Sequence, residues 1–159
     1  MRTTTLWAAL TTAVLALPVS AQAADHESAQ PRAATVKLRS DHWEARVVAL
    51  TNQRREANGR KPLKAASCPD RYAEPWARHL ATTRVLVHQD LTPMLSCPHT
   101  SYAGENIAYG YETPRELVSA WMHSPGHRAN ILRRHFHRIG VSGWRATDGT
   151  TYATQDFVG

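Results

Sequence analysis

The first half of the chain carries apolar residues at the three-to-four-residue spacing of an amphipathic helix. Ser40 can cap a helix that begins at Asp41, and Asn58-Gly59 supplies a stop signal after it. The apolar face of this predicted helix consists of Trp43, Val47 and Leu50.

A second helix is expected from about Pro69, a residue suited to the first turn, to about Val87. Pro75 lies inside this stretch and removes one backbone hydrogen bond, so we expect either a kink there or a helix that begins nearer Glu74. The apolar stripe of this helix consists of Tyr72, Trp76, Leu80 and Ala81.

Two shorter helices are predicted further along the chain. Thr113-Pro114-Arg115-Glu116 is a capping box with proline at the first helical position, and this third helix runs to the break at Ser124-Pro125-Gly126. A fourth helix is expected from about His127 to Arg134.

The pattern then changes to the alternation of β-strands. Ile139, Val141 and Gly143 alternate with Gly140 and Ser142, which indicates a strand. Residues 151–158 are rich in β-branched and aromatic side chains and predict the returning strand. The intervening Asp148-Gly149 is typical of a two-residue hairpin turn. Helices followed by an antiparallel hairpin predict an α+β domain.

Residues 1–23 have the features of a secretory signal peptide. The stretch from Leu6 to Leu17 is apolar apart from two threonines, and Ala21-Gln22-Ala23 fits a small-x-small cleavage site. A membrane-spanning helix needs roughly 20 apolar residues, so we expect a secreted, extracellular protein without a transmembrane anchor after signal cleavage. Residues 24–40 are polar and are interpreted as a flexible leader, which leaves one domain over residues 41–159.

Positive charge is in excess along the chain. Nineteen lysine and arginine residues stand against 13 acidic ones, a formal net charge of +6, and most of the basic residues are arginine. Because arginine binds phosphate and carboxylate groups well, the candidate partners are anionic cell-wall polymers and lipids, or a protein. The charge also has a simpler interpretation as an aid to solubility. No nucleic-acid-binding module is recognisable, so we expect no nucleic-acid partner.

The chain has two cysteines, Cys68 and Cys97. An exported chain meets an oxidising compartment, so we expect them to form a disulfide. In the chain-entropy model, closing a loop of about 30 residues contributes roughly 3–4 kcal/mol to stability. The alternative is a metal-binding or catalytic pair, although the two do not form a Cys-x-x-Cys motif.

Four side chains are candidates for chemistry. His88 follows the second predicted helix, Glu105 lies in a Gly-Glu-Asn triplet interpreted as a turn, His127 follows a Pro-Gly break, and Tyr152 lies on the last strand. Two imidazoles and a carboxylate suit zinc with open positions, so His88, Glu105 and His127 are the candidate metal ligands. His88 and Glu105 are also candidate catalytic residues, as general acid and base.

Each candidate also has a structural interpretation. His88 can cap helix carbonyls, Glu105 can accept hydrogen bonds from loop amides, and His127 can be an ordinary surface residue. Ser124 and His127 are close enough in sequence for a nucleophile and base, but no orienting acid accompanies them.

Several motifs occur in a familiar order: Leu50-Thr51-Asn52-Gln53-Arg54-Arg55, Trp76-Ala77-Arg78 leading to His88, Gly104-Glu105-Asn106-Ile107-Ala108, Trp121 to Leu132, Ile139-Gly140-Val141, and Tyr152 to Phe157. In this arrangement the chain resembles the bacterial branch of the CAP superfamily, also called the SCP, PR-1 or cysteine-rich secretory protein family. The resemblance covers roughly residues 41–159.

The resemblance implies a three-layer α-β-α sandwich with a small antiparallel sheet between helices. It also implies a central cavity, which two histidines and two acidic residues line in eukaryotic relatives. His88 matches the first histidine and Glu105 the first glutamate, whereas Ser124 replaces the second glutamate and Tyr152 the second histidine. We hypothesise that His127 supplies the second imidazole from a different position.

These features predict a secreted CAP-domain protein with a His/Glu-lined cavity formed by His88, Glu105, Ser124, His127 and Tyr152. Its ligand would be a divalent metal ion, a small molecule, a lipid or a cell-wall component. We expect that the protein requires no cofactor. If it binds one, the candidate is a zinc-like divalent metal ion. Enzymatic activity is left open, because one alternative is a metal-assisted extracellular hydrolase that uses Glu105 or His88. Another is an interaction module with a vestigial cavity.

Overall fold

The computed structural model describes residues 34–38 and 42–159. The predicted signal peptide, the leader up to residue 33 and the predicted Ser40 cap lie outside the described residues. The elements are β1 (Val36–Lys37), α1 (Trp43–Glu56), β2 (Lys64–Ala65), α2 (Ser67–Thr83), the 3₁₀-helix η1 (Thr92–Ser96), β3 (Ala103–Tyr109), α3 (Pro114–His123), α4 (Pro125–Leu132), β4 (Arg138–Arg145) and β5 (Thr151–Val158).

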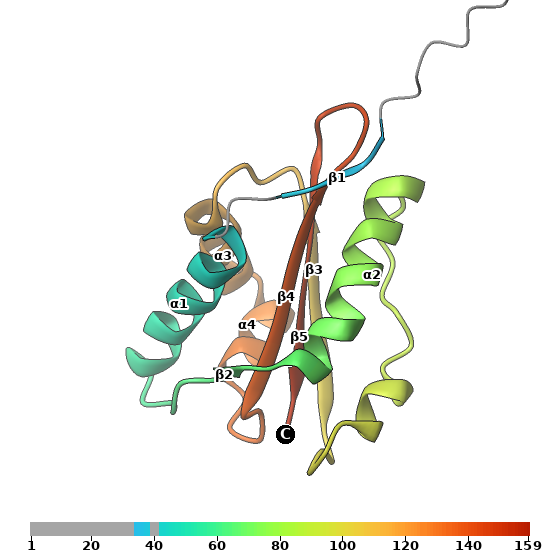
Figure 1. The fold of residues 1–159 in the computed structure, drawn as a ribbon. Coiled ribbons are helices and arrows are strands. Elements are labelled where there is room, and N and C mark those ends of the chain that lie inside the picture. The colour runs from blue at the N-terminus through green and yellow to red at the C-terminus, as the bar shows by residue number, and fades with distance from the viewer. Residues whose placement is uncertain (1–33, 39–41) are drawn as a thin grey trace, which may run out of the picture. The chain divides into compact units, whose positions relative to one another are not determined.

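A β-sheet forms the middle layer, and helices cover both of its faces (Figure 1). The strand order is β1-β4-β5-β3, with β2 beside β4. β3, β5 and β4 are antiparallel neighbours, whereas β2 runs parallel to β4. α2 packs on one face, and α1, α3 and α4 pack on the other. The predicted three-layer α-β-α sandwich is confirmed.

Within the described residues, the four α-helices agree with the prediction in number but not in every boundary, and the 3₁₀-helix η1 was not predicted. α1 begins at Trp43 rather than Asp41. α2 runs from Ser67 to Thr83 with Pro75 inside it, so a start nearer Glu74 is wrong. It ends before Val87 because Arg84 adopts a left-handed conformation and closes the last turn onto Leu80.

The two later helices, α3 and α4, begin with the kinds of residue that the sequence predicted. The capping box of α3 is formed by Thr113 and Glu116, as predicted. α4 covers Pro125–Leu132, two residues earlier than predicted, because Pro125 occupies its first turn and Ser124 precedes it as the N-cap residue.

The prediction of a turn around Glu105 is wrong. Residues 103–109 form β3, which pairs along its whole length with β5, so that Glu105 lies opposite Asp156. Gly104 and Asn106 are poor strand formers, so pairing with β5 overrides the local preference.

The sheet has two further differences from the prediction. The β4–β5 connection is a longer loop, not a two-residue turn, because Ala146 N donates to Thr150 O and Gly149 takes the left-handed position. Val36 and Lys37, placed by the sequence in the leader, pair as β1 with β4.

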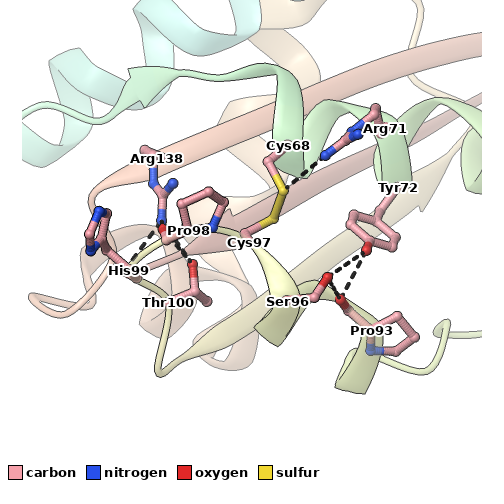
Figure 2. The surroundings of a disulfide bond; sticks show 10 residues. All are labelled: Cys68, Arg71, Tyr72, Pro93, Ser96, Cys97, Pro98, His99, Thr100 and Arg138. Carbon is pink, nitrogen blue, oxygen red and sulfur yellow. Dashed lines mark hydrogen bonds between the residues drawn. A yellow bond between two sulfur atoms is a disulfide. The ribbon is translucent and has the colours of Figure 1, made fainter.

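The predicted disulfide between Cys68 and Cys97 is confirmed, with a Cα–Cα distance of 5.8 Å (Figure 2). It joins the first turn of α2 to the residue after η1. Hydrogen bonds surround it: Tyr72 Oη donates to Pro93 O at 2.9 Å, and Arg138 Nη2 donates to Thr100 Oγ1 at 2.8 Å. The chain between α2 and β3 is therefore fixed at its far end.

Candidate functional site

An exposed imidazole stands over a buried carboxylate at the β3 edge of the sheet. His88 lies between α2 and η1, and its Nδ1 donates to Oε1 of Glu105 at 2.6 Å. The His88 side chain is 60% exposed, whereas that of Glu105 is 1% exposed. The buried acid thus fixes the ring, and Nε2 is the ring nitrogen left to contact a ligand.

Gln89 joins Glu105 to a second buried acid. Its Nε2 donates to Glu105 Oε2 at 2.7 Å and to Asp156 Oδ2 at 3.1 Å, and its backbone N–H donates to Glu105 Oε1 at 3.3 Å. The two acids come from β3 and β5, where they are directly opposite in the register. His88, Gln89, Glu105 and Asp156 therefore form one hydrogen-bonded network.

The surroundings of Asp156 oppose ionisation of its carboxyl. Asp156 has no exposed surface, and burial raises the pKa of its carboxyl well above the usual range. The neighbouring Glu105 raises this pKa further, while the hydrogen bond from Gln89 lowers it.

His127 lies in the first turn of α4, close enough to His88 for the charge of one ring to affect the other. Burial lowers the pKa of its imidazole, and the proximity of His88 lowers it further. Its backbone carbonyl accepts a hydrogen bond from Asn106 Nδ2 at 3.2 Å. Asn130 donates to Asn106 Oδ1 at 3.0 Å and to the Glu105 carbonyl at 2.9 Å. These bonds tie α4 to β3 and so place His127 near the network.

Two predicted site residues take other roles. Ser124 is the junction between α3 and α4, where its N–H donates to Trp121 O and its carbonyl accepts from Arg128 N. Tyr152 packs in a buried cluster with α2 residues, four positions along β5 from Asp156. At about 3.3 Å per residue, this separation is about 13 Å. The sheet register therefore separates Tyr152 from Glu105.

The donor set does not fit a closed metal site. Within the described part of the chain, no three His, Cys, Asp or Glu side chains are arranged to hold a metal ion, so His88, Glu105 and His127 do not form such a group. Both carboxylate oxygens of Glu105 already accept hydrogen bonds. The accessible donors are two imidazoles, with Glu105 supporting one ring, and this set fits an open site with positions left for water or a ligand.

The His88 side of the site is open to solvent. Four clefts of about 300 to 580 Å³ occur elsewhere on the domain, and none of these four is lined by His88, Glu105 or His127. Because the His88 side chain is 60% exposed, a ligand would meet this ring at the surface.

Sequence reasoning missed Gln89 and Asp156. The signal that could have revealed Asp156 is an acid inside a strand whose eight residues are all buried. In the Tyr152-to-Phe157 motif this acid occupies a position that the motif leaves variable.

Comparison with known proteins identifies the family. Residues 48–157 match the model of the cysteine-rich secretory protein family, CAP. The uncharacterized protein YkwD of Bacillus subtilis is 38% identical over 124 residues, which cover 74% of this chain and 47% of YkwD. The chain thus spans about half the length of that relative. Human Golgi-associated plant pathogenesis-related protein 1 is 24% identical over 132 residues, 73% of this chain and 82% of the human protein.

Solved structures share the fold. An outer surface protein of Borrelia burgdorferi superposes with a TM-score of 0.69 at 18% identity, over 77% of this chain and 96% of its own. An extracellular protein containing an SCP domain from Bacillus anthracis gives a TM-score of 0.61 at 24% identity, over 72% of this chain and 39% of its own. Among the residues that the structure describes, no helix combines the length and the apolar character that crossing a membrane requires. From the family match, the extent of the YkwD relationship and the α-β-α fold, we conclude that this chain belongs to the CAP, or cysteine-rich secretory protein, family.

Proposed function

We propose that this CAP-domain protein acts outside the cell and binds a divalent metal ion of the zinc type through the imidazoles of His88 and His127. The remaining coordination positions would be open to water or to a ligand's polar group. Glu105 would orient His88 rather than bind the ion.

The observation that carries this proposal is the 2.6 Å hydrogen bond from His88 Nδ1 to the buried Glu105 carboxylate. It selects the tautomer whose Nε2 is a lone-pair donor, which is the form that binds metals. The lowered pKa of His127 favours the neutral ring there as well. A bound ion would supply Lewis acidity at the mouth of the site.

Zinc titration of the purified protein by calorimetry tests the proposal. His88→Ala and His127→Ala should each weaken zinc binding at least about tenfold, because each removes one of two protein ligands. Glu105→Gln should weaken it by about 10- to 100-fold, as expected for the partner of a ligating histidine. His42→Ala, at an exposed histidine that precedes α1, is the matched control and should bind like the original protein.

Equal affinity in all four variants would refute metal binding at this site. Loss of binding in His42→Ala to the same extent would mean that zinc binds to scattered surface histidines and not to a defined site.

A hydrolase is the second candidate, because a buried acid that orients an exposed imidazole is also the arrangement of a general base. In that case Glu105→Gln should abolish turnover of an ester or peptide substrate at saturating zinc, where weaker metal binding by the variant is compensated. Unchanged turnover in Glu105→Gln would exclude His88, oriented by Glu105, as a general base.

The extracellular location rests on the signal peptide predicted for residues 1–23 and on relatives described as extracellular or outer-surface proteins. Expression of the full chain in a bacterial host should release a product that begins at Ala24. N-terminal sequencing of protein from the culture medium checks this, and an uncleaved product retained in the cell would contradict it.

A further inference from the structure

A basic cleft opens between the end of α1 and the α4–β4 connection, at the other end of α4 from His127. Its volume is about 310 Å³, within the range of about 300–1,000 Å³ that small-ligand sites occupy. Its lining residues are Arg55, Gly59, Arg60, Lys61, Arg134, Phe136 and His137. Most of these residues are lysine or arginine, and none is acidic.

Arg55 forms the buried side of this basic cleft. It is 1% exposed and donates to the backbone carbonyls of Lys61, Ile131, Arg133 and Phe136 at 2.6–3.3 Å. Burial lowers the pKa of its guanidinium, and the charge of Arg60 adds to this effect. Fully buried arginines in proteins are normally paired with an anion, whereas here the partners are neutral carbonyls.

The walls of the basic cleft are held rigidly. Arg55 connects the α1–β2 segment to the α4–β4 segment, and Arg60 Nε adds a second connection to Leu132 O at 2.9 Å. A site whose walls are fixed before binding loses little conformational entropy when a ligand arrives.

The positive charge in the basic cleft is not neutralised by the protein. None of the salt bridges found among residues 34–38 and 42–159 includes Arg55, Arg60, Lys61 or Arg134. The carbonyls at the end of α4 account for the positions of Arg55 and Arg60. They do not account for Lys61 and Arg134, whose exposed side chains line the same cleft.

We propose that the basic cleft binds the phosphate group of an anionic ligand, with Lys61, Arg60 and Arg134 as its contacts above the buried charge of Arg55. Convergent lysine and arginine side chains around a small rigid cleft match a compact, multiply charged oxyanion. The phosphate could belong to a soluble ester, to a polymer or to a lipid headgroup, since all three present the same group. This site is separate from His88 and does not depend on the proposed metal binding.

Isothermal titration of the purified protein with inorganic phosphate, in metal-free buffer at low ionic strength, tests the proposal. The double variant Lys61→Ala/Arg134→Ala should weaken phosphate binding at least about tenfold, because it removes two charged contacts. Both side chains are exposed and make no hydrogen bond among the described residues, so the variant should fold. Arg46→Ala/Arg115→Ala removes the same charge from exposed positions on α1 and α3 and should leave the affinity essentially unchanged.

Three results would overturn the proposal: no phosphate binding by the original protein, equal binding by the Lys61/Arg134 variant, or an equal loss in the Arg46/Arg115 control. Retained binding in His88→Ala supports a site independent of the metal. Flotation with phosphatidylglycerol vesicles, compared with glycerol 3-phosphate in solution, then assigns the source. Vesicle binding that is lost in the Lys61/Arg134 variant indicates a lipid headgroup, and binding of glycerol 3-phosphate alone indicates a soluble or polymer-borne phosphate.

Discussion

Asp156 shows how a single buried residue couples the site to pH. Its pKa in the folded protein is well above the ordinary value of 3.8, because it is buried and lies near Glu105. An acid whose pKa rises on folding stabilises the fold while it is protonated. That contribution is lost as the pH increases from its unfolded pKa through its folded pKa.

The Asp156→Asn variant should not show this loss of stability at rising pH. Asparagine keeps an oxygen acceptor for Gln89 and cannot ionise, so the stability of the variant relative to the original protein should increase between about pH 4 and about pH 8. Urea denaturation at the two pH values measures the difference in free energy of unfolding.

Asp90→Asn is a suitable comparison, because Asp90 is exposed and hydrogen bonds from Thr92 lower the pKa of its carboxyl. Its variant should show no such gain at high pH. An identical pH dependence in the original protein and Asp156→Asn would mean that Asp156 is already ionised in the fold.

At the scale of single residues, the sequence predicted only the site residues that belong to recognisable motifs. His88 and Glu105 were predicted and lie in contact. Gln89 and Asp156 were not, because their importance comes from the pairing of β3 with β5 and from the path of the chain after α2. Neither relation leaves a local pattern.

Among the elements, one of the closest approaches is between β4 and the start of α2. A Cβ atom on Gly140 would lie 2.3 Å from Asp70 N and 2.4 Å from Pro69 C. Both are backbone atoms, so neither can rotate away as a side chain would. The absence of a side chain at this position therefore sets how closely α2 lies on the sheet.

Gly140→Ala should accordingly destabilise the fold by about 3 kcal/mol, the upper part of the usual range for overpacking. Gly126→Ala is the matched control, since its Cβ would meet nothing within 4 Å and it lies in α4. Alanine should stabilise that helix by about 0.5–1 kcal/mol. Thermal and urea denaturation compare the two, and equal stabilities would show that α2 can shift outward freely.

Prediction of elements succeeded where the signal is local. The capping box defined the start of α3, and the run of β-branched residues gave β5 its observed bounds. β1 and β2 have two residues each and are strands only because they pair with β4. Two residues are too few to show an alternating sequence pattern that would predict a strand. The prediction for β3 was wrong for a related reason. This segment is a strand because it pairs with β5, and its own residues do not favour a strand.

At the scale of the whole molecule, the segment between α2 and the disulfide carries half of the candidate site. Residues 84–91 have no regular structure, and they include His88 and Gln89. Besides the bonds to Glu105, the segment is held by Trp76 Nε1, which donates to Val87 O at 3.1 Å. Its far end is fixed by the Cys68–Cys97 bond shown in Figure 2.

Cys68→Ala/Cys97→Ala should therefore lower the free energy of unfolding by roughly 3–4 kcal/mol. It should also weaken zinc binding, because His88 would be less firmly placed. The original protein treated with a reductant should match the variant in both measurements. A variant as stable as the oxidised protein would show that the hydrogen bonds alone secure the segment.

The disulfide also bears on when, in the life of the chain, the site becomes complete. Cysteines stay reduced in the cytosol and pair only in an oxidising compartment. A newly made chain would thus hold His88 on a loosely tethered segment, and it would draw little metal from the pool that cytosolic enzymes share. Under the proposed function, metal capture would begin after export, once the covalent bond has formed, and the maturation of the protein and the onset of metal binding would be one event.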